Sequence, residues 1–212
     1  MGSQTRKIAV IGDIVSSTKI ADRDQVQKKL VGVIRLLNHS NSALDSPYTI
    51  TLGDEFQAVL SKGDDIFLDA VSILEALHPE KVRFSFGIGT LSTALNREQA
   101  IGMDGPAFHN ARSAMRGLKR TRHLFRIVGI GDPCSELINQ SLCLISHAAR
   151  NWKKNRLQIL RMLGDEIPVK NIASMLGLSD KAIYKAINAE DLRTILELFN
   201  SVTKVVNASL EE

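Results

Sequence analysis

Hydrophobic residues in the first third of the chain follow two periods, one typical of buried strands and one typical of amphipathic helices. The segment KIAVIGD at 7–13 is a short β-branched run ending in Gly12-Asp13, which predicts a buried strand that stops at a turn. Residues 22–38 carry apolar positions at helical spacing, which predicts a helix with Asp22 as its N-cap. The next segment, YTITLGDEFQAVL, predicts a β-hairpin, because Gly53 supplies the positive φ that a tight turn needs.

The pattern continues with two more helices and two more strands. Apolar residues on one face predict a helix over 63–78, which Pro79 ends. The next strand is predicted at VRFSFGIGTL. A helix is expected to begin near Asp104-Gly105-Pro106, because proline suits the first helical position, and a last strand is predicted at HLFRIVGIG. This order, β-α-β-β-α-β with a further α-β, predicts an α+β domain of the ferredoxin-like type.

The last third of the chain carries helical spacing only. Within RLQILRMLGDEIPVKNIASMLGLSDKAIYKAIN at 156–188, one helix ends at Leu163-Gly164, Pro168 opens a second, and Ser179 caps a third. Gly177 permits a sharp turn between the last two, which is the spacing of a helix-turn-helix. We therefore expect a ferredoxin-fold domain at 1–131, a connecting helix at 132–155 and a small all-α helix-turn-helix domain at 156–212.

Composition narrows the class of protein. The chain has 212 residues, 44% hydrophobic and 24% charged, as in ordinary globular proteins. It contains no run of 18 apolar residues and no signal peptide pattern, so we expect no membrane association. Cys134 and Cys143 lie nine residues apart without metal-ligand spacing, which argues against a zinc finger or a disulfide scaffold and favours the reducing cytoplasm.

Charge is distributed unevenly along the chain. Residues 1–106 have a net charge of −2, whereas residues 107–161 carry 11 Lys/Arg against only Asp132 and Glu136, a net charge of +9. A basic segment of this kind suggests a polyanionic partner, either phosphates or nucleic acid. The alternative is a solvated basic helix face.

Two carboxylates are expected to meet at one edge of the sheet. In the predicted topology the second strand of the hairpin, which follows the Gly53 turn, runs antiparallel beside the first strand of the chain. Asp13 at the end of the first strand therefore meets Asp54 and Glu55 at the start of that hairpin strand. Carboxylates this close repel unless a cation lies between them, and Mg²⁺ with phosphate oxygens is the usual occupant. The alternative is that Asp13 and Asp54 only form turns and caps.

The motifs around these carboxylates resemble known families. GDIVSST at 12–18 and TLGDEFQAVL at 51–60 are similar to the two metal-binding segments of class III nucleotidyl cyclases, and the second also to the corresponding turn of diguanylate cyclases. FSFGIGTL and MDGPAFHNAR follow in the order of the later cyclase strand and helix. The series GDIVSS, TITLGDEFQ, VRFSFGIG and GMDGPAFHNAR also resembles the SatD family, over roughly residues 7–126.

The cyclase resemblance implies a ligand set for a nucleotide with Mg²⁺ or Mn²⁺. It assigns the metal to Asp13, Asp54 and the Ile14 carbonyl, and Glu55, next to Asp54, is a further candidate ligand by its position. The phosphates would lie against the segment from Gly12 to Thr18, where Ser16 and Ser17 allow close approach, and against Gly53.

The chain departs from the cyclase pattern in its base-selecting and transition-state positions. Ile50 stands where a cyclase lysine selects adenine, and His109 and Ser113 stand where asparagine and arginine are expected, with Arg112 one residue out of register. His109, Arg112 and Arg116 nevertheless share one helical stripe, which either binds phosphates or is an exposed basic face.

The predicted helix-turn-helix points to double-stranded DNA as a second partner. The outward side of the second helix would enter a major groove with Ser179, Asp180, Lys181, Tyr184 and Lys185. The DNA phosphates would be contacted by Lys153, Lys154, Arg156 and Lys170. A last helix over 189–208 either seals the tail or pairs two chains into the homodimer that a two-fold operator requires. The alternative is a helical hairpin that dimerises or caps the first domain without DNA.

Three functions fit these motifs. The first is a DNA-binding regulator whose cyclase-like domain binds a nucleotide with Mg²⁺. The second is an active nucleotidyl cyclase or transferase that uses two metals, with Arg112 or Arg116 neutralising the charge that develops on the phosphate. The third is a dimerisation scaffold without a ligand.

Overall fold

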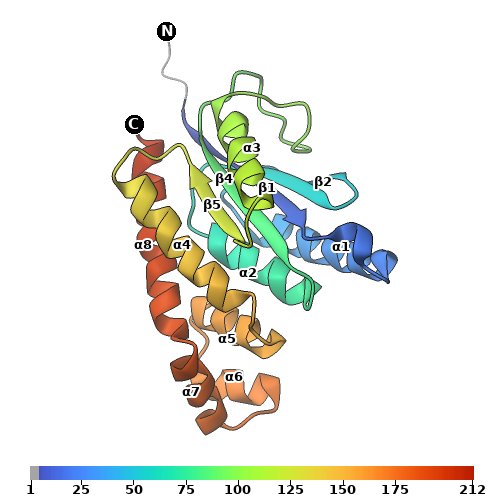
Figure 1. Cartoon of the computed structure of the whole chain (residues 1–212), viewed down its shortest axis with the longest axis vertical. Coiled ribbons are helices and arrows are strands. Elements are labelled where there is room, and N and C mark those ends of the chain that lie inside the picture. The colour runs from blue at the N-terminus through green and yellow to red at the C-terminus, as the bar shows by residue number, and fades with distance from the viewer. Residues whose placement is uncertain (1–4) are drawn as a thin grey trace.

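A five-stranded sheet forms the centre of the structure, a computed structural model that describes residues 5–212 (Figure 1). Its strands are β1 (Lys7–Ile14), β2 (Leu44–Leu52), β3 (Glu55–Leu60), β4 (Val82–Gly89) and β5 (Phe125–Val128). They lie in the order β2-β3-β1-β4-β5. The central β1 pairs antiparallel with β3 and β4, and β4 pairs parallel with β5, so the predicted contact between the first strand and the strand after the hairpin is present.

Helices cover both faces of the sheet, because β1 and β4 are apolar on both sides. On one face, Ile8 and Val10 pack with α1 (Arg23–Ser40) and α2 (Ile66–Leu77). On the other face, Ala9 and Ile11 pack with α3 (Pro106–Lys119). The sequence therefore yields an α+β layered fold in which, among the described residues, α3 is the helix that covers this second face of the sheet (Figure 1).

A long loop, residues 90–105, joins β4 to α3 and was not expected as a structural feature. It packs on the α3 side of the sheet, where the Ala100 N–H donates to Thr49 Oγ1 at 2.9 Å and the Gln57 side-chain amide donates to the Ala100 carbonyl. Ala100 and Met103 are buried there beside α3. The loop thus completes the layer that α3 begins.

The second half of the described chain is helical. Its helices are α4 (Cys134–Ala149), α5 (Lys154–Gly164), α6 (Val169–Leu176), α7 (Asp180–Ala189) and α8 (Leu192–Leu210). The helix expected at 132–155 is α4, and residues 150–153 separate it from α5. The helix expected from 189 begins at Leu192, because Asp191 has φ 47° and this left-handed conformation interrupts the helix.

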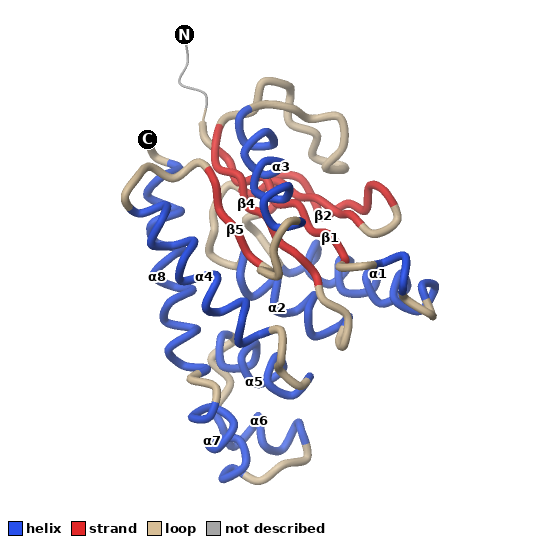
Figure 2. The backbone as a smooth tube through the Cα atoms, viewed as in Figure 1, coloured by secondary structure: helices blue, strands red, loops and turns tan. Residues whose placement is uncertain are grey.

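The last helix returns to the sheet. α8 runs beside α4, and the C-terminus ends near β1 and the N-terminus, while α6 and α7 lie at the opposite end of the molecule (Figures 1 and 2). Phe199 of α8 stacks on Phe67 of α2 with ring centroids 4.4 Å apart, and meets Phe125 of β5 edge-on at 6.1 Å. One hydrophobic core therefore continues from the sheet into the helical tail.

None of the helices in the described residues combines the length and the apolar character that crossing a bilayer requires.

Candidate functional site

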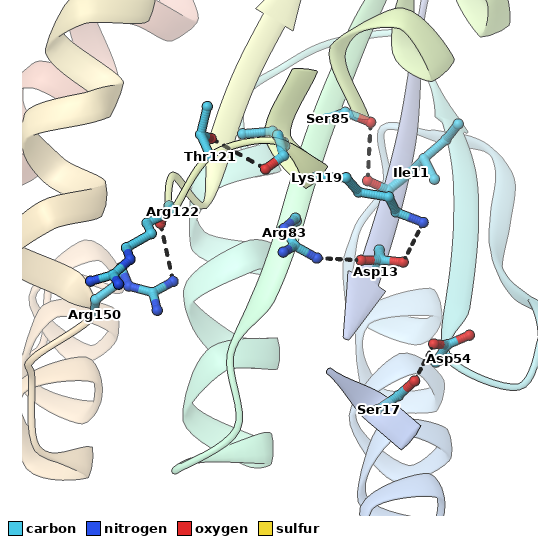
Figure 3. A network of polar contacts seen from close by, with 11 residues as sticks. Ile11, Asp13, Ser17, Asp54, Arg83, Ser85, Lys119, Thr121, Arg122 and Arg150 are labelled. Atoms are coloured by element: carbon cyan, nitrogen blue, oxygen red, sulfur yellow. Dashed lines mark hydrogen bonds and ion pairs between the residues drawn. The ribbon is translucent and has the colours of Figure 1, made fainter. Parts of the chain in front are cut away.

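Asp13 lies at the end of β1 between two cations (Figure 3). Arg83 of β4 approaches its Oδ2 at 2.9 Å, and Lys119 at the end of α3 approaches its Oδ1 at 2.7 Å. The side chain of Asp13 is 8% exposed, that of Arg83 15% and that of Lys119 48%. A buried carboxylate needs such partners, since an unpaired charge in the interior costs several kcal/mol, on the order of 3–5.

The alternation of β1 explains this placement. Ala9 and Ile11 point to the α3 side of the sheet, so Asp13, two residues further, points there as well and reaches Lys119. Gly12 lies on the opposite side, where a Cβ would collide with the ring of Phe56. The glycine before Asp13 therefore makes room for a core phenylalanine.

Two further carboxylates adjoin Asp13. Glu55 is its direct partner across the β1–β3 ladder. Asp54 precedes Glu55 in the chain. The Asp54 carbonyl accepts a hydrogen bond from the Ile14 N–H at 3.1 Å, and the Asp54 carboxylate accepts one from the Ser17 hydroxyl (Figure 3). The pKa of Glu55 is raised, chiefly by burial. The charge of Lys119, and less strongly that of Arg112, opposes this shift, while the negative charges of Asp13 and Asp54 add to it. The expected neighbourhood of Asp13 and Glu55 is present, whereas the Asp54 carboxylate turns to Ser17.

The donor set at this edge allows only one mode of Mg²⁺ binding. Carboxylate and carbonyl oxygens suit Mg²⁺, and Lys119 already places a cation on Asp13. However, no group of three or more His, Cys, Asp or Glu side chains in residues 5–212 is arranged to hold a metal ion. The residues therefore fit Mg²⁺ that arrives with phosphates and takes one or two carboxylates, and they do not form an all-protein metal cage.

The segment expected to cradle phosphates forms a tight turn. Ser16 has φ 56° and Ser17–Lys19 forms a short 3-10 helix, in which Ser17 is buried and Thr18 is exposed. Gly53 adopts the predicted positive φ, 55°. A cavity of only about 20 Å³, whose lining includes Ile14, Ser17, Gly53 and Asp54, lies between the two turns. Such a space holds about one water-sized group, so phosphates would bind outside it.

The stripe on α3 is exposed and partly paired. His109 Nε2 lies 3.2 Å and Arg112 Nη1 3.1 Å from Asp104 Oδ1. The pKa of Asp104 is lowered, most strongly by a hydrogen bond from the Gly105 backbone N–H and next by one from the Arg112 side chain. Arg116 is exposed one turn further along, and Lys119 follows on the same stripe. The stripe thus leads from the exposed surface to the buried Asp13.

Arg83 and Lys119 are the two site residues that the sequence analysis missed. Lys119 continues the spacing of Arg112 and Arg116, so the stripe itself contained the signal. Arg83 is the single charged residue in the strand VRFSFGIG, and the structure places it opposite Asp13 in the β1–β4 register.

The residues expected to contact DNA lie on the surface of α6 and α7. Lys170, Asp180, Lys181, Tyr184 and Lys185 are all exposed. Gly177 ends α6 with φ 64°, and the Ser179 hydroxyl accepts the Ala182 N–H at 3.2 Å as the N-cap of α7. Of the predicted phosphate contacts, Lys153 and Lys154 are exposed, whereas Arg156 lies 3.9 Å from Glu190.

Comparisons with known proteins extend these observations. The model of the SatD family matches residues 7–205, which include the sheet and almost all of the tail. No curated protein matches. Two structures of a bacterial light-regulated adenylyl cyclase are similar at 16% identity over 59% of this chain, with TM-scores of 0.38 and 0.41. The match covers 43% and 44% of those chains, so this chain spans less than half of their length.

Proposed function

Because the chain belongs to the SatD family, whose model spans the sheet and the tail together, we propose that both parts serve one regulatory function. In this proposal a cyclase-like palm formed by β1–β4 binds a nucleotide with Mg²⁺, and a helix-turn-helix formed by α6 and α7 binds double-stranded DNA. The observation that carries the proposal is the charge cluster at the end of β1, where Asp13 binds Arg83 and Lys119 and lies opposite Glu55, the residue after Asp54. Clusters with shifted pKa values gather at functional sites.

Lys119 is the residue best suited to receive the phosphates. Its side chain is 48% exposed, so its ammonium can leave Asp13 and contact a phosphate at the surface, whereas the more buried Arg83 stays on Asp13. Asp13, Asp54 and the Ile14 carbonyl would hold Mg²⁺, which supplies charge neutralisation for the phosphates when bound. Arg116 lies on the same stripe and adds a further exposed cation.

The surface of α7 supports the DNA-binding half of the proposal. Lys181, Tyr184 and Lys185 are exposed on its outer side, and Lys170 of α6 is exposed as well. Lysines of this kind contact phosphates, and residues of a recognition helix contact base edges. α6 and α7 also lie at the end of the molecule furthest from the termini, where their outer surface is open (Figure 1).

The nucleotide regulates DNA binding only if it prefers one arrangement of the sheet and the tail. α8 supplies the connection, because it follows α7 directly and packs Phe199 against α2 and β5. We expect the arrangement that binds nucleotide to differ in how α8 positions α7.

A nucleotidyl cyclase or transferase is the second candidate. The observation that favours it is the exposed Arg116, which lies on one stripe with Lys119 and is free to stabilise a phosphate during reaction. In that case a ribose hydroxyl attacks the α-phosphate and pyrophosphate leaves. Incubation with each nucleoside triphosphate and Mg²⁺, followed by product analysis, separates the two candidates, because the regulator returns its nucleotide unchanged.

Thermal unfolding with a panel of nucleotides, with and without Mg²⁺, tests the proposed site. We expect at least one nucleotide to raise the melting temperature only with Mg²⁺, and we expect Asp54→Asn to lose this shift while its amide oxygen still accepts from Ser17. Asp24→Asn is the matched control, because it removes the same charge from an exposed position on α1. Absence of any Mg²⁺-dependent shift in the wild-type protein contradicts the proposal.

A further inference from the structure

An acidic cavity lies on the side of the sheet opposite Asp13. It has a volume of about 620 Å³ and lies between α1, α2 and α5, where the sheet domain meets the helical tail. Its size falls within the range of small-molecule sites, roughly 300–1,000 Å³. Val33, Leu36 and Leu68 give it apolar walls. The proposed nucleotide function does not involve these residues.

Charge in the cavity is strongly unbalanced. Asp65, Asp69, Glu75 and Asp165 line it, and Arg161 is its single cation among the described residues. That arginine is already occupied, because its Nε lies 2.7 Å from Glu75 and its Nη1 lies 3.0 Å from Asp165. Two of the four carboxylates, Asp65 and Asp69, therefore have no cationic partner within the cavity.

Asp69 is the buried member of this set. It is 4% exposed, and its Oδ2 accepts hydrogen bonds from Asn41 at 2.8 Å and from the Tyr48 hydroxyl at 2.9 Å, both of which are neutral. Its Oδ1 has no hydrogen-bond partner in the described residues. Burial raises the pKa of Asp69 to about 6, which reflects a carboxylate held without a compensating charge.

Asp65 faces the same cavity from the start of α2. It is the N-cap residue, yet its side chain makes no capping hydrogen bond. Burial, followed by Asp64 and Asp165, raises the pKa of Asp65. An acidic residue at a helix N-terminus normally has its ionised form stabilised, so the opposite shift reflects burial first and the neighbouring carboxylates second.

The arrangement of the carboxylates selects the kind of cation. The two carboxylates without a cationic partner, Asp65 at the N-cap of α2 and Asp69 in its first turn, are separated by four residues, about 6 Å at 1.5 Å per residue. No group of three or more acidic, His or Cys side chains among residues 5–212 is arranged to hold a metal ion. Two unpaired carboxylates at this spacing, beside apolar walls, fit a cation whose charged groups are joined by a short hydrocarbon chain.

We propose that this cavity binds an organic polycation of the polyamine class, with ammonium groups on Asp69 and Asp65 and methylene groups against Leu36 and Leu68. A bound polyamine would bridge α2 and the end of α5, since Asp165 is the C-cap of α5. The helix C-terminus there adds a further partial negative charge. The ligand therefore links the sheet domain to the first helix of the tail.

Calorimetric titration of the full chain with spermidine at low salt tests this proposal. We expect saturable binding that weakens by at least about tenfold in Asp69→Asn, whose amide oxygen still accepts from Asn41 and Tyr48, and also in the exposed Asp165→Asn. Asp24→Asn, an exposed change of the same charge on α1, should leave the affinity unchanged.

Three results overturn the proposal. The first is the absence of binding to the wild-type protein. The second is equal weakening in all three variants, which indicates screening of the overall charge. The third is equal binding of butylamine, which has one ammonium group and cannot bridge Asp65 and Asp69. Because the test contains no nucleotide, its outcome is independent of the proposed nucleotide site.

Discussion

Two buried aspartates are held by opposite kinds of neighbour. Asp13 lies between the cations Arg83 and Lys119, whereas Asp69 receives its hydrogen bonds from the neutral Asn41 and Tyr48. The first arrangement compensates the negative charge of the carboxylate, and the second leaves it uncompensated. The two sites therefore respond differently to substitution and to pH.

The partners of Asp13 contribute unequally to stability. We expect Arg83→Met to reduce the free energy of unfolding by about 3 kcal/mol, because it leaves a nearly buried carboxylate with one exposed partner. Lys119→Met should cost about 1 kcal/mol or less, since the Lys119 side chain is 48% exposed and its charge is screened. Urea denaturation at neutral pH measures both values, and an equal loss contradicts this account of the cluster.

Asp69→Asn should stabilise the protein above pH 6. The pKa of Asp69 is raised from 3.8 to about 6 in the folded protein, so the native state binds this proton more tightly than the unfolded chain. Its contribution to stability is therefore greatest below pH 4 and falls as pH rises through 6. The free energy of unfolding of the variant should exceed that of the wild type by about 1–3 kcal/mol at pH 7 and equal it at pH 4. Urea denaturation of both proteins at each pH measures this difference. A pH-independent difference would falsify the assignment.

Among the elements, α3 is the one that determines the geometry of the Asp13 cluster. Its backbone packs directly on β4, where a Cβ at Gly87 would collide with the Ala107 carbonyl oxygen and the Ala111 nitrogen. This close approach brings Lys119 at the end of α3 to Asp13. The position of the helix thus depends on the missing side chain of Gly87 and, at the start of α3, on that of Gly89.

Gly87→Ala should displace α3 and destabilise the protein by about 1–3 kcal/mol, the usual cost of overpacking. Gly32→Ala in α1 is the matched control, because a Cβ at Gly32 meets nothing within 4 Å. That control should stabilise the protein by about 0.5–1 kcal/mol through helix propensity. Thermal or urea unfolding measures both, and equal effects of the two substitutions contradict direct packing of α3 on β4.

The sequence predicted the elements well, because hydrophobic periodicity is a local property. The hairpin at Gly53 and the helices on both sides of Gly177 are found where the pattern placed them. The loop at 90–105 was missed, because its order comes from contacts with Thr49 and Gln57, which are distant in sequence.

The candidate site was predictable only in part. The pairing of Asp13 with Glu55 followed from topology, whereas the Asp54 carboxylate binds Ser17 instead. The ion pairs with Arg83 and Lys119, and the cavity around Asp69, depend on how helices pack, and one sequence contains no direct signal for that.

At the scale of the whole molecule, the tail and the sheet share one core. Phe199 of α8 stacks on Phe67 and meets Phe125 edge-on, and the Gly63 N–H, just before α2, donates to the Asn207 side chain of α8 at 2.7 Å. Arg6 beside β1 donates to the Ser209 carbonyl at 2.6 Å. Because α8 contacts the sheet domain at several points along its length, a change in the sheet domain has a direct route to α7.

The most direct test of the central claim is the affinity for DNA with and without nucleotide. Fluorescence anisotropy of a labelled duplex of about 30 base pairs at low salt reports binding by α6 and α7, and titration with each nucleotide and Mg²⁺ reports its regulation. We predict salt-dependent binding that changes by at least about fivefold with one nucleotide, and that Asp54→Asn binds DNA but no longer responds. DNA binding that is absent at low salt, or that saturating nucleotide leaves unaltered, contradicts the account.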